Sequence, residues 1–185
     1  MRARQPGQSA LLLLDAIAVL KAQAIDYAVI GAMAASVHGE LRATTDADAL
    51  ISVTVSKLAS LRPLFKEAGF ETDLRRGDAD DPIPAILLIS DAHGNRVDLL
   101  SGLTGLDPQA FSRTVDVPFS GDTLRVIGRE DFIAMKCFAG GPQDIVDAQA
   151  ALRGSQEAVD LDLLRRITRR FGRGAADVLE ELLAR

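Results

Sequence analysis

TDADALI, at Thr45–Ile51, places two carboxylates directly before an apolar run. If the segment is a β-strand, its side chains alternate between the two faces, so Asp46 and Asp48 point to the same face. Two like charges side by side repel each other and stabilise no sheet. A divalent cation commonly resolves this repulsion, because hard Mg²⁺ binds one or two carboxylates together with substrate phosphates. The stretch therefore predicts a strand that carries a Mg²⁺ site.

The segment before the acidic pair supports this interpretation. Tyr27–Ile30 is a short apolar strand candidate that runs straight into Gly31. A strand that ends at glycine and opens a helix presents backbone N–H groups and the positive helix end, which together bind phosphate. The alternatives are a tight strand-to-helix turn without a ligand and a purely structural pair of aspartates.

A third carboxylate follows in an apolar setting. Ala85–Ser90 and Arg96–Leu100 predict a hairpin, because turn-forming residues separate two apolar segments. Asp98 lies on the second arm between apolar residues. We expect this arm to lie beside the strand of Asp46 and Asp48 and to complete a metal site; the alternative is an aspartate on the solvent face of an edge strand.

This order of features resembles the nucleotidyltransferase superfamily of the polymerase-β-like fold. Its signature is an apolar residue, then Gly-Gly or Gly-Ser, a helical stretch, and an acid-x-acid motif on a strand. Ile30, Gly31, Asp46 and Asp48 match it, whereas Ala32 stands where the family has Gly or Ser. The resemblance implies an α+β fold, with a mixed β-sheet flanked by helices and a helical C-terminal segment. It also implies transfer of a nucleoside monophosphate from an NTP to a hydroxyl, with release of pyrophosphate.

The resemblance assigns roles to the three carboxylates. Asp46, Asp48 and Asp98 would be catalytic and would hold two Mg²⁺ ions, for which Mn²⁺ could substitute. Asp98 would serve as the third ligand or take the proton from the attacking hydroxyl.

Other residues would contact the nucleotide. Gly31 and Ala32 would present N–H groups to the triphosphate, and Arg42 and Thr45 stand close to the acids in sequence. For Arg42, a solvated loop position with a weak ion pair is the equal alternative.

The C-terminal part carries a second resemblance, to minimal nucleotidyltransferases of the AbiEii toxin type. Two adjacent acids open an apolar helix that contains Lys136, and after a Gly/Pro break a second helix contains Asp144 and Asp147. By resemblance Lys136 would reach the triphosphate, and the two aspartates would orient it or stabilise the helix pair. Gln143 stands where these proteins usually have Lys or Arg. For the aspartates, favourable placement at a helix N-terminus is the alternative.

Length and composition bound the organisation. The chain has 185 residues, of which 48% are hydrophobic and 25% charged, as in ordinary globular proteins. We expect a catalytic core at 1–128 and a helical segment at 129–185 packed on it. No apolar stretch approaches the roughly 20 residues of a membrane span, which predicts a cytoplasmic protein without a membrane partner.

The charge of the chain bears on whether the hydroxyl acceptor could be a nucleic acid. The formal net charge of −5 disfavours a global interaction with a polyanion, so a nucleic-acid contact would be local. Five arginines lie within Arg165–Arg173, and helical spacing predicts one shared face for four of them: Arg166, Arg169, Arg170 and Arg173. A solvated face balanced by neighbouring acids is favoured over a grip on nucleic acid.

The sequence does not decide which molecule supplies the acceptor hydroxyl. RNA, including tRNA, or protein is favoured, with the chain acting as a toxin beside a cognate antitoxin. The alternatives are an antibiotic or other small-molecule acceptor, and a non-catalytic protein of the same fold that senses nucleotide or docks a partner.

Overall fold

The computed structural model describes residues 1–39, 41–78, 80–154 and 158–184. Its strands are β1 (Tyr27–Val29), β2 (Asp46–Ile51), β3 (Glu71–Arg76), β4 (Ala85–Ser90), β5 (Arg96–Ser101), β6 (Val115–Phe119) and β7 (Asp122–Val126). Its α-helices are α1 (Ser9–Ala22), α2 (Gly31–His38), α3 (Val55–Glu67), α4 (Arg129–Ala139), α5 (Pro142–Arg153), α6 (Leu161–Thr168) and α7 (Arg173–Leu183). Two 3₁₀ helices, η1 (Pro108–Ser112) and η2 (Arg169–Phe171), complete these elements.

The described strands form one mixed sheet in the order β3-β4-β5-β2-β1-β7-β6. β4 and β5 pair antiparallel, which confirms the predicted hairpin. β2 lies between β1, to which it is antiparallel, and β5, to which it is parallel. The strand of the acidic pair is therefore internal, and the strand of Asp98 is its direct neighbour.

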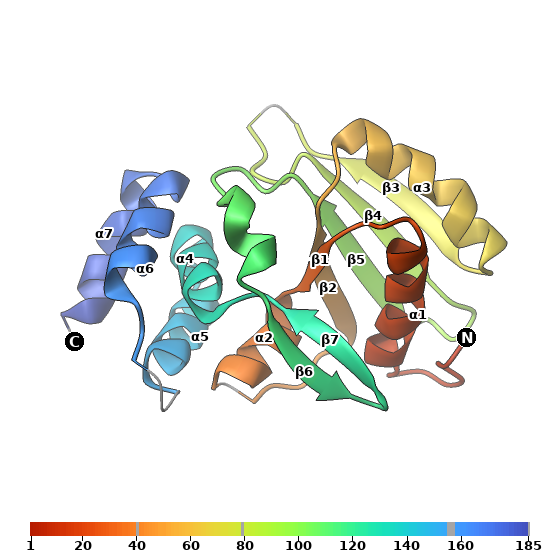
Figure 1. Ribbon diagram of the computed structural model, residues 1–185, viewed down its shortest axis with the longest axis horizontal. Coiled ribbons are helices and arrows are strands. Elements are labelled where there is room, and N and C mark those ends of the chain that lie inside the picture. The colour runs from red at the N-terminus through yellow and green to blue at the C-terminus, as the bar shows by residue number, and fades with distance from the viewer. Residues whose placement is uncertain (40, 79, 155–157, 185) are drawn as a thin grey trace.

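Alternation of side chains separates the two faces of β2. Ala47, Ala49 and Ile51 are buried, whereas Asp46 and Asp48 are half-buried on the other face. Helix α1 packs against β2 and β5, and α3 packs against β3 and β4 and contacts α1. Figure 1 shows these two helices together on one side of the molecule. Apolar burial beneath α1 and α3 thus leaves the opposite face of β2 for the carboxylates.

The last helices have their own packing. α4 contacts α5, α6 and α7, and Figure 1 shows α4–α7 gathered at the end of the molecule away from α1 and α3. Helix α2 joins them to the sheet, because it contacts both β2 and α5. The fold is therefore the predicted α+β arrangement, a mixed sheet flanked by helices with a helical C-terminal segment. Among the described residues, no helix combines the length and apolar character that crossing a membrane requires.

Candidate functional site

The acidic residues of β2 and β5 share one face of the sheet. In the parallel pairing Asp48 lies directly opposite Asp98, and Asp46 lies opposite Arg96. All four are at alternate positions of neighbouring strands, so their side chains project to the same side. The structure confirms the predicted adjacency of the two acidic strands. We call these four residues the carboxylate face.

Arg96 is the member of the carboxylate face to which the sequence assigned no role. Its Nε donates to Asp98 Oδ1 and its NH2 donates to Asp98 Oδ2, each at 3.0 Å. Both oxygens of Asp98 are therefore engaged by a guanidinium fork, the strong bidentate form of this ion pair. The signal in the sequence was the spacing of Arg96 and Asp98, which puts both side chains on one strand face.

Gly31 comes close to Asp48 from the start of α2. Its φ is +63°, and a Cβ at this position would lie 2.2 Å from Asp48 Oδ2. The N–H of Ile30 donates to the carbonyl of Asp48 at 2.9 Å, which fixes the end of β1 against β2. Only glycine fits here, because the positive φ disfavours other residues and a Cβ would collide with Asp48. The first turn of α2, including Ala32, consequently begins beside the carboxylate, with N–H groups that no intrahelical acceptor uses.

Electrostatics at Asp48 reflect this crowding. Burial, followed by the negative charges of Asp46 and Asp98, raises the pKa of Asp48 to about 6, while the positive charges of Arg96 and Lys136 oppose the rise. The carboxylates offer only hard oxygen donors, and Asp48 Oδ2 occupies the space that a Cβ at position 31 would take, so glycine lets this oxygen lie at the start of α2. Asp46 and Asp48 therefore fit a divalent cation of the Mg²⁺ type, which needs only one or two carboxylates when phosphates supply other ligands.

Asp98 is placed differently from the other two acids. Within the described ranges, no group of three or more His, Cys, Asp or Glu side chains is arranged to hold a metal ion. The structure thus brings Asp98 beside Asp48 but gives its oxygens to Arg96. Its role as a third metal ligand stays a prediction.

Two hydroxyl groups brace the carboxylate face, and the sequence reasoning assigned neither to the site. Thr44 Oγ1 lies 3.0 Å from Asp46 Oδ1 and 2.9 Å from the Asp46 carbonyl, so its single proton is shared between them. Ser9 Oγ donates to the carbonyl of Thr45 at 2.6 Å and accepts from the N–H of Arg96 at 3.0 Å. Ser9 thereby joins the beginnings of β2 and β5. The side chain of Thr45, predicted to contact nucleotide, is exposed.

Lys136, Asp144 and Asp147 form a second charged group between α4 and α5, with Arg42 and Gln143 as its other members; we call it the lysine cluster. Lys136 Nζ lies 2.8 Å from Asp144 Oδ1 and 2.7 Å from Asp147 Oδ2. Arg42 contacts the same Oδ2 at 3.1 Å, and Gln143 Nε2 donates to Asp147 Oδ1 at 3.0 Å. Gln143 therefore takes part in the cluster despite its departure from the resembled pattern.

The side chain of Asp147 is fully buried within the lysine cluster. Burial alone would raise the pKa of Asp147, but hydrogen bonds from Lys136 and Gln143, with the charges of Lys136 and Arg42, outweigh it and hold the pKa below its ordinary value. The predicted nucleotide contacts of Lys136, Arg42, Asp144 and Asp147 stay predictions. In this structure the four residues bind one another, and the charge of Lys136 also acts on Asp48.

The C-terminal arginines do not share one helical face, so this prediction is wrong. α6 ends at Thr168, η2 follows, and Gly172, with φ +103°, separates it from α7, which begins at Arg173. The left-handed glycine interrupts the helical spacing from which the shared face was inferred.

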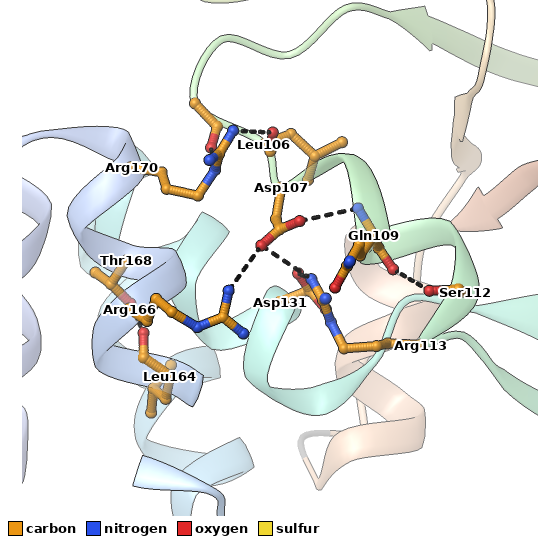
Figure 2. A network of polar contacts seen from close by, with 11 residues as sticks. Leu106, Asp107, Gln109, Ser112, Arg113, Asp131, Leu164, Arg166, Thr168 and Arg170 are labelled. Carbon is orange, nitrogen blue, oxygen red and sulfur yellow. Dashed lines mark hydrogen bonds and ion pairs between the residues drawn. The ribbon is translucent and has the colours of Figure 1, made fainter. Parts of the chain in front are cut away.

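Intramolecular partners engage several of these arginines. Arg165 pairs with Glu180 at 2.8 Å and Arg173 approaches Asp177 at 3.7 Å, as expected for a face balanced by acids. Figure 2 shows Asp107 between Arg113 and Arg166, and Arg170 against the carbonyl of Leu106. These contacts attach α6 and η2 to the segment around η1.

Comparison with known proteins supports the fold. No protein-family model and no curated protein matches the chain. Solved structures do match. An antigenic nucleotidyltransferase-like protein from Paracoccidioides brasiliensis aligns with a TM-score of 0.56 and 17% identity, over 99% of this chain and 96% of that one. The crystal structure of ANT(2'')-Ia in complex with adenylyl-2''-tobramycin aligns with a TM-score of 0.58 and 12% identity, over 87% and 95% of the two chains.

A solution structure of the antibiotic-resistance factor ANT(2'')-Ia gives a TM-score of 0.61 at 10% identity, over 95% of this chain and 97% of that one. At such identities the likeness concerns the fold, and the closer resemblance to the AbiEii toxin type stays a prediction. The matches in fold nevertheless extend over most of each chain: the chain has a nucleotidyltransferase-like fold.

Proposed function

We propose that this protein is a divalent-cation-dependent nucleotidyltransferase, which moves a nucleoside monophosphate from an NTP to a hydroxyl acceptor and releases pyrophosphate. The observation that carries the proposal is the convergence of Asp46, Asp48 and Asp98 on one sheet face, with Gly31 opening a helix beside Asp48. A purely structural role for three acids would not explain why Asp48 Oδ2 lies against the first residue of α2, in space that any side chain at position 31 would fill.

The chain's own residues divide the work. Asp46 and Asp48 would hold Mg²⁺, or Mn²⁺ in its place, which would neutralise charge on the triphosphate during in-line displacement at the α-phosphorus. The N–H groups of Gly31 and Ala32 would bind phosphate oxygens at the positive end of α2. Lys136 would contribute positive charge from α4. Asp98 would accept the proton of the attacking hydroxyl through lone pairs that Arg96 leaves free, because each carboxylate oxygen has more than one acceptor position.

For the acceptor we propose a hydroxyl of RNA or protein. Its support is the paired-helix arrangement of Lys136, Asp144 and Asp147, which resembles the AbiEii toxin type and would accompany a toxin role with a cognate antitoxin. A second candidate is a cationic small molecule. It is favoured by the excess of negative charge on the carboxylate face and by the match to ANT(2'')-Ia, whose structure contains adenylyl-2''-tobramycin.

Nucleotide titration tests the reaction class. We expect at least one of the four NTPs to bind in the presence of Mg²⁺, and the affinity to fall at least about 100-fold in the Asp46→Asn/Asp48→Asn protein. Asp116→Asn, which removes an exposed carboxylate from β6, should bind as wild type does. Binding that is equal in wild type and the double variant would place the nucleotide elsewhere and contradict the proposal.

Pyrophosphate release then separates the acceptors. Release stimulated by tRNA or a protein substrate would support the first candidate, and release stimulated by tobramycin would support the second. Mg²⁺-dependent NTP binding without release under either condition would favour the nucleotide-sensing alternative.

A further inference from the structure

The pair Arg96–Asp98 differs from an ordinary surface ion pair in its burial and its surroundings. The side chain of Asp98 is 15% exposed and lies on an internal strand, whereas the same spacing on the edge strand β3 gives the pair Arg75–Asp73, in which both side chains are 64% exposed. Exposed pairs of the second kind contribute little energy. The carboxylate of Asp98, by contrast, is half-buried, so its pairing with the more exposed guanidinium of Arg96 matters more.

Arg96 is also held in place by its backbone. Its N–H donates to Ser9 Oγ, which binds Thr45 on the neighbouring strand. The residue before it, Asn95, is 1% exposed and donates to Asp91 Oδ2 at 2.8 Å and to the carbonyl of Gln5 at 2.9 Å. These hydrogen bonds fix the backbone at Arg96. Its bidentate contact with Asp98 is therefore a defined part of the carboxylate face.

The guanidinium of Arg96 engages the carboxylate of Asp98, which a second cation would need as a ligand. Arg96 lies opposite Asp46 and two positions from Asp98, so it stands within the block of four alternating residues. Its fork takes an acceptor position on each Asp98 oxygen. Three carboxylates and one guanidinium leave two negative units, which a single divalent cation neutralises.

On the basis of the proposed function, we infer that Arg96 takes the place of a second divalent cation. Asp46 and Asp48 hold one ion, and the guanidinium permanently compensates and orients Asp98. Arg96 is in this sense a positioning residue: it acts through Asp98 and fixes the number of ions at the site. This differs from the two-ion arrangement that the family resemblance implies.

Counting bound Mn²⁺ by electron paramagnetic resonance tests the inference. The holoprotein would be titrated with Mn²⁺ alone and with Mn²⁺ plus the α,β-methylene analogue of each NTP. We expect one Mn²⁺ per wild-type chain and two in Arg96→Gln, with the spin–spin broadening of ions about 4 Å apart. Arg96→Gln/Asp98→Asn should return to one. The matched control Arg75→Gln should bind one, as wild type does.

The outcomes separate the two proposals. Two coupled Mn²⁺ ions in wild type, or one ion in a folded Arg96→Gln protein, would overturn the inference and leave the proposed function standing. No Mn²⁺ in wild type, with or without the nucleotide analogues, would overturn the proposed function itself. Circular dichroism checks that each variant is folded. Arg96→Lys, which keeps the charge but loses the fork, should retain a count of one, and a count of two would also overturn the inference.

Discussion

Asp48 and Asp147 are both withdrawn from solvent, yet the protein shifts their pKa values in opposite directions. Asp48 stands among other carboxylates, and its pKa rises to about 6. Asp147 is fully buried but receives Lys136, Arg42 and Gln143, and its pKa is lowered. Burial is common to both, so the difference lies in the partners. Asp48, which lacks enough positive charge around it, can bind a cationic ligand. Asp147, whose charge is already compensated by neighbouring side chains, stabilises the fold.

The largest effect should follow from breaking the lysine cluster. Lys136→Met removes the closest cation from the buried Asp147, and we expect the free energy of unfolding to fall by about 3 kcal/mol, because an uncompensated buried charge is costly. Urea denaturation at neutral pH measures the change. Lys57→Met, at an exposed position on α3, serves as the control and should unfold as wild type does. Equal stability of the two variants would show that Arg42 and Gln143 suffice for Asp147.

Removing the charge of Asp48 should increase the free energy of unfolding, the opposite of the effect expected for Lys136→Met. The pKa of Asp48 in the folded protein, about 6, lies above the ordinary 3.8, so the folded state binds the proton more tightly. Wild type therefore loses stability as pH rises through the window between the two values, and the loss is complete above the higher one. Asp48→Asn cannot ionise. In the absence of divalent cations it should match wild type below pH 4 and exceed it by about 2–3 kcal/mol above pH 6, because one pKa unit corresponds to about 1.4 kcal/mol.

Thermal or urea unfolding across this pH range measures the difference, with Asp116→Asn as the control that should follow wild type throughout. A variant that is less stable than wild type at pH 8 would show that Asp48 already has a compensating partner. The comparison with Asp147 would then fail.

The smallest effect on stability, and the most specific, should come from Gly31→Ala. Both Gly31, at φ +63°, and Gly94, at φ +79°, occupy the left-handed region, but an added Cβ meets Asp48 only at Gly31, since nothing lies within 4 Å at Gly94. Each substitution should cost about 1–2 kcal/mol for its backbone conformation. Only Gly31→Ala should also weaken binding of Mn²⁺ and nucleotide, measured by calorimetry. Equal nucleotide affinity in the two variants would remove Gly31 from the site.

The elements and their approximate bounds could be predicted from the sequence because they depend on local periodicity. Helices α4 and α5 lie on either side of the Gly/Pro break, as predicted, and the hairpin of β4 and β5 follows from its turn residues. The adjacency of Asp48 and Asp98 was one of two alternatives in the sequence, and the family resemblance supported it, since strand adjacency is a tertiary property that local periodicity does not determine.

Partners distant in sequence could not be predicted. The contacts of Lys136 with Asp144 and Asp147 across two helices were anticipated only as one of two roles for the aspartates, and the contact of Lys136 with a triphosphate stays a prediction. The shared arginine face failed for a local reason: helical spacing was extended beyond Thr168, where α6 ends, and through Gly172, which separates η2 from α7. The bidentate contact of Arg96 with Asp98 could have been predicted from the sequence, because their spacing alone puts both side chains on one strand face.

The parallel pairing of β2 with β5 also governs when the site can exist during folding. The two strands are joined by a long excursion through α3, β3 and β4, so their contact closes a large loop. Such non-local pairings form slowly compared with helices and hairpins. A slip of two residues would keep every side chain on its face and yet set Asp48 against Arg96 instead of Asp98. The carboxylate face is thus a late product of chain assembly, and a partly folded chain with all its helices formed would still lack it.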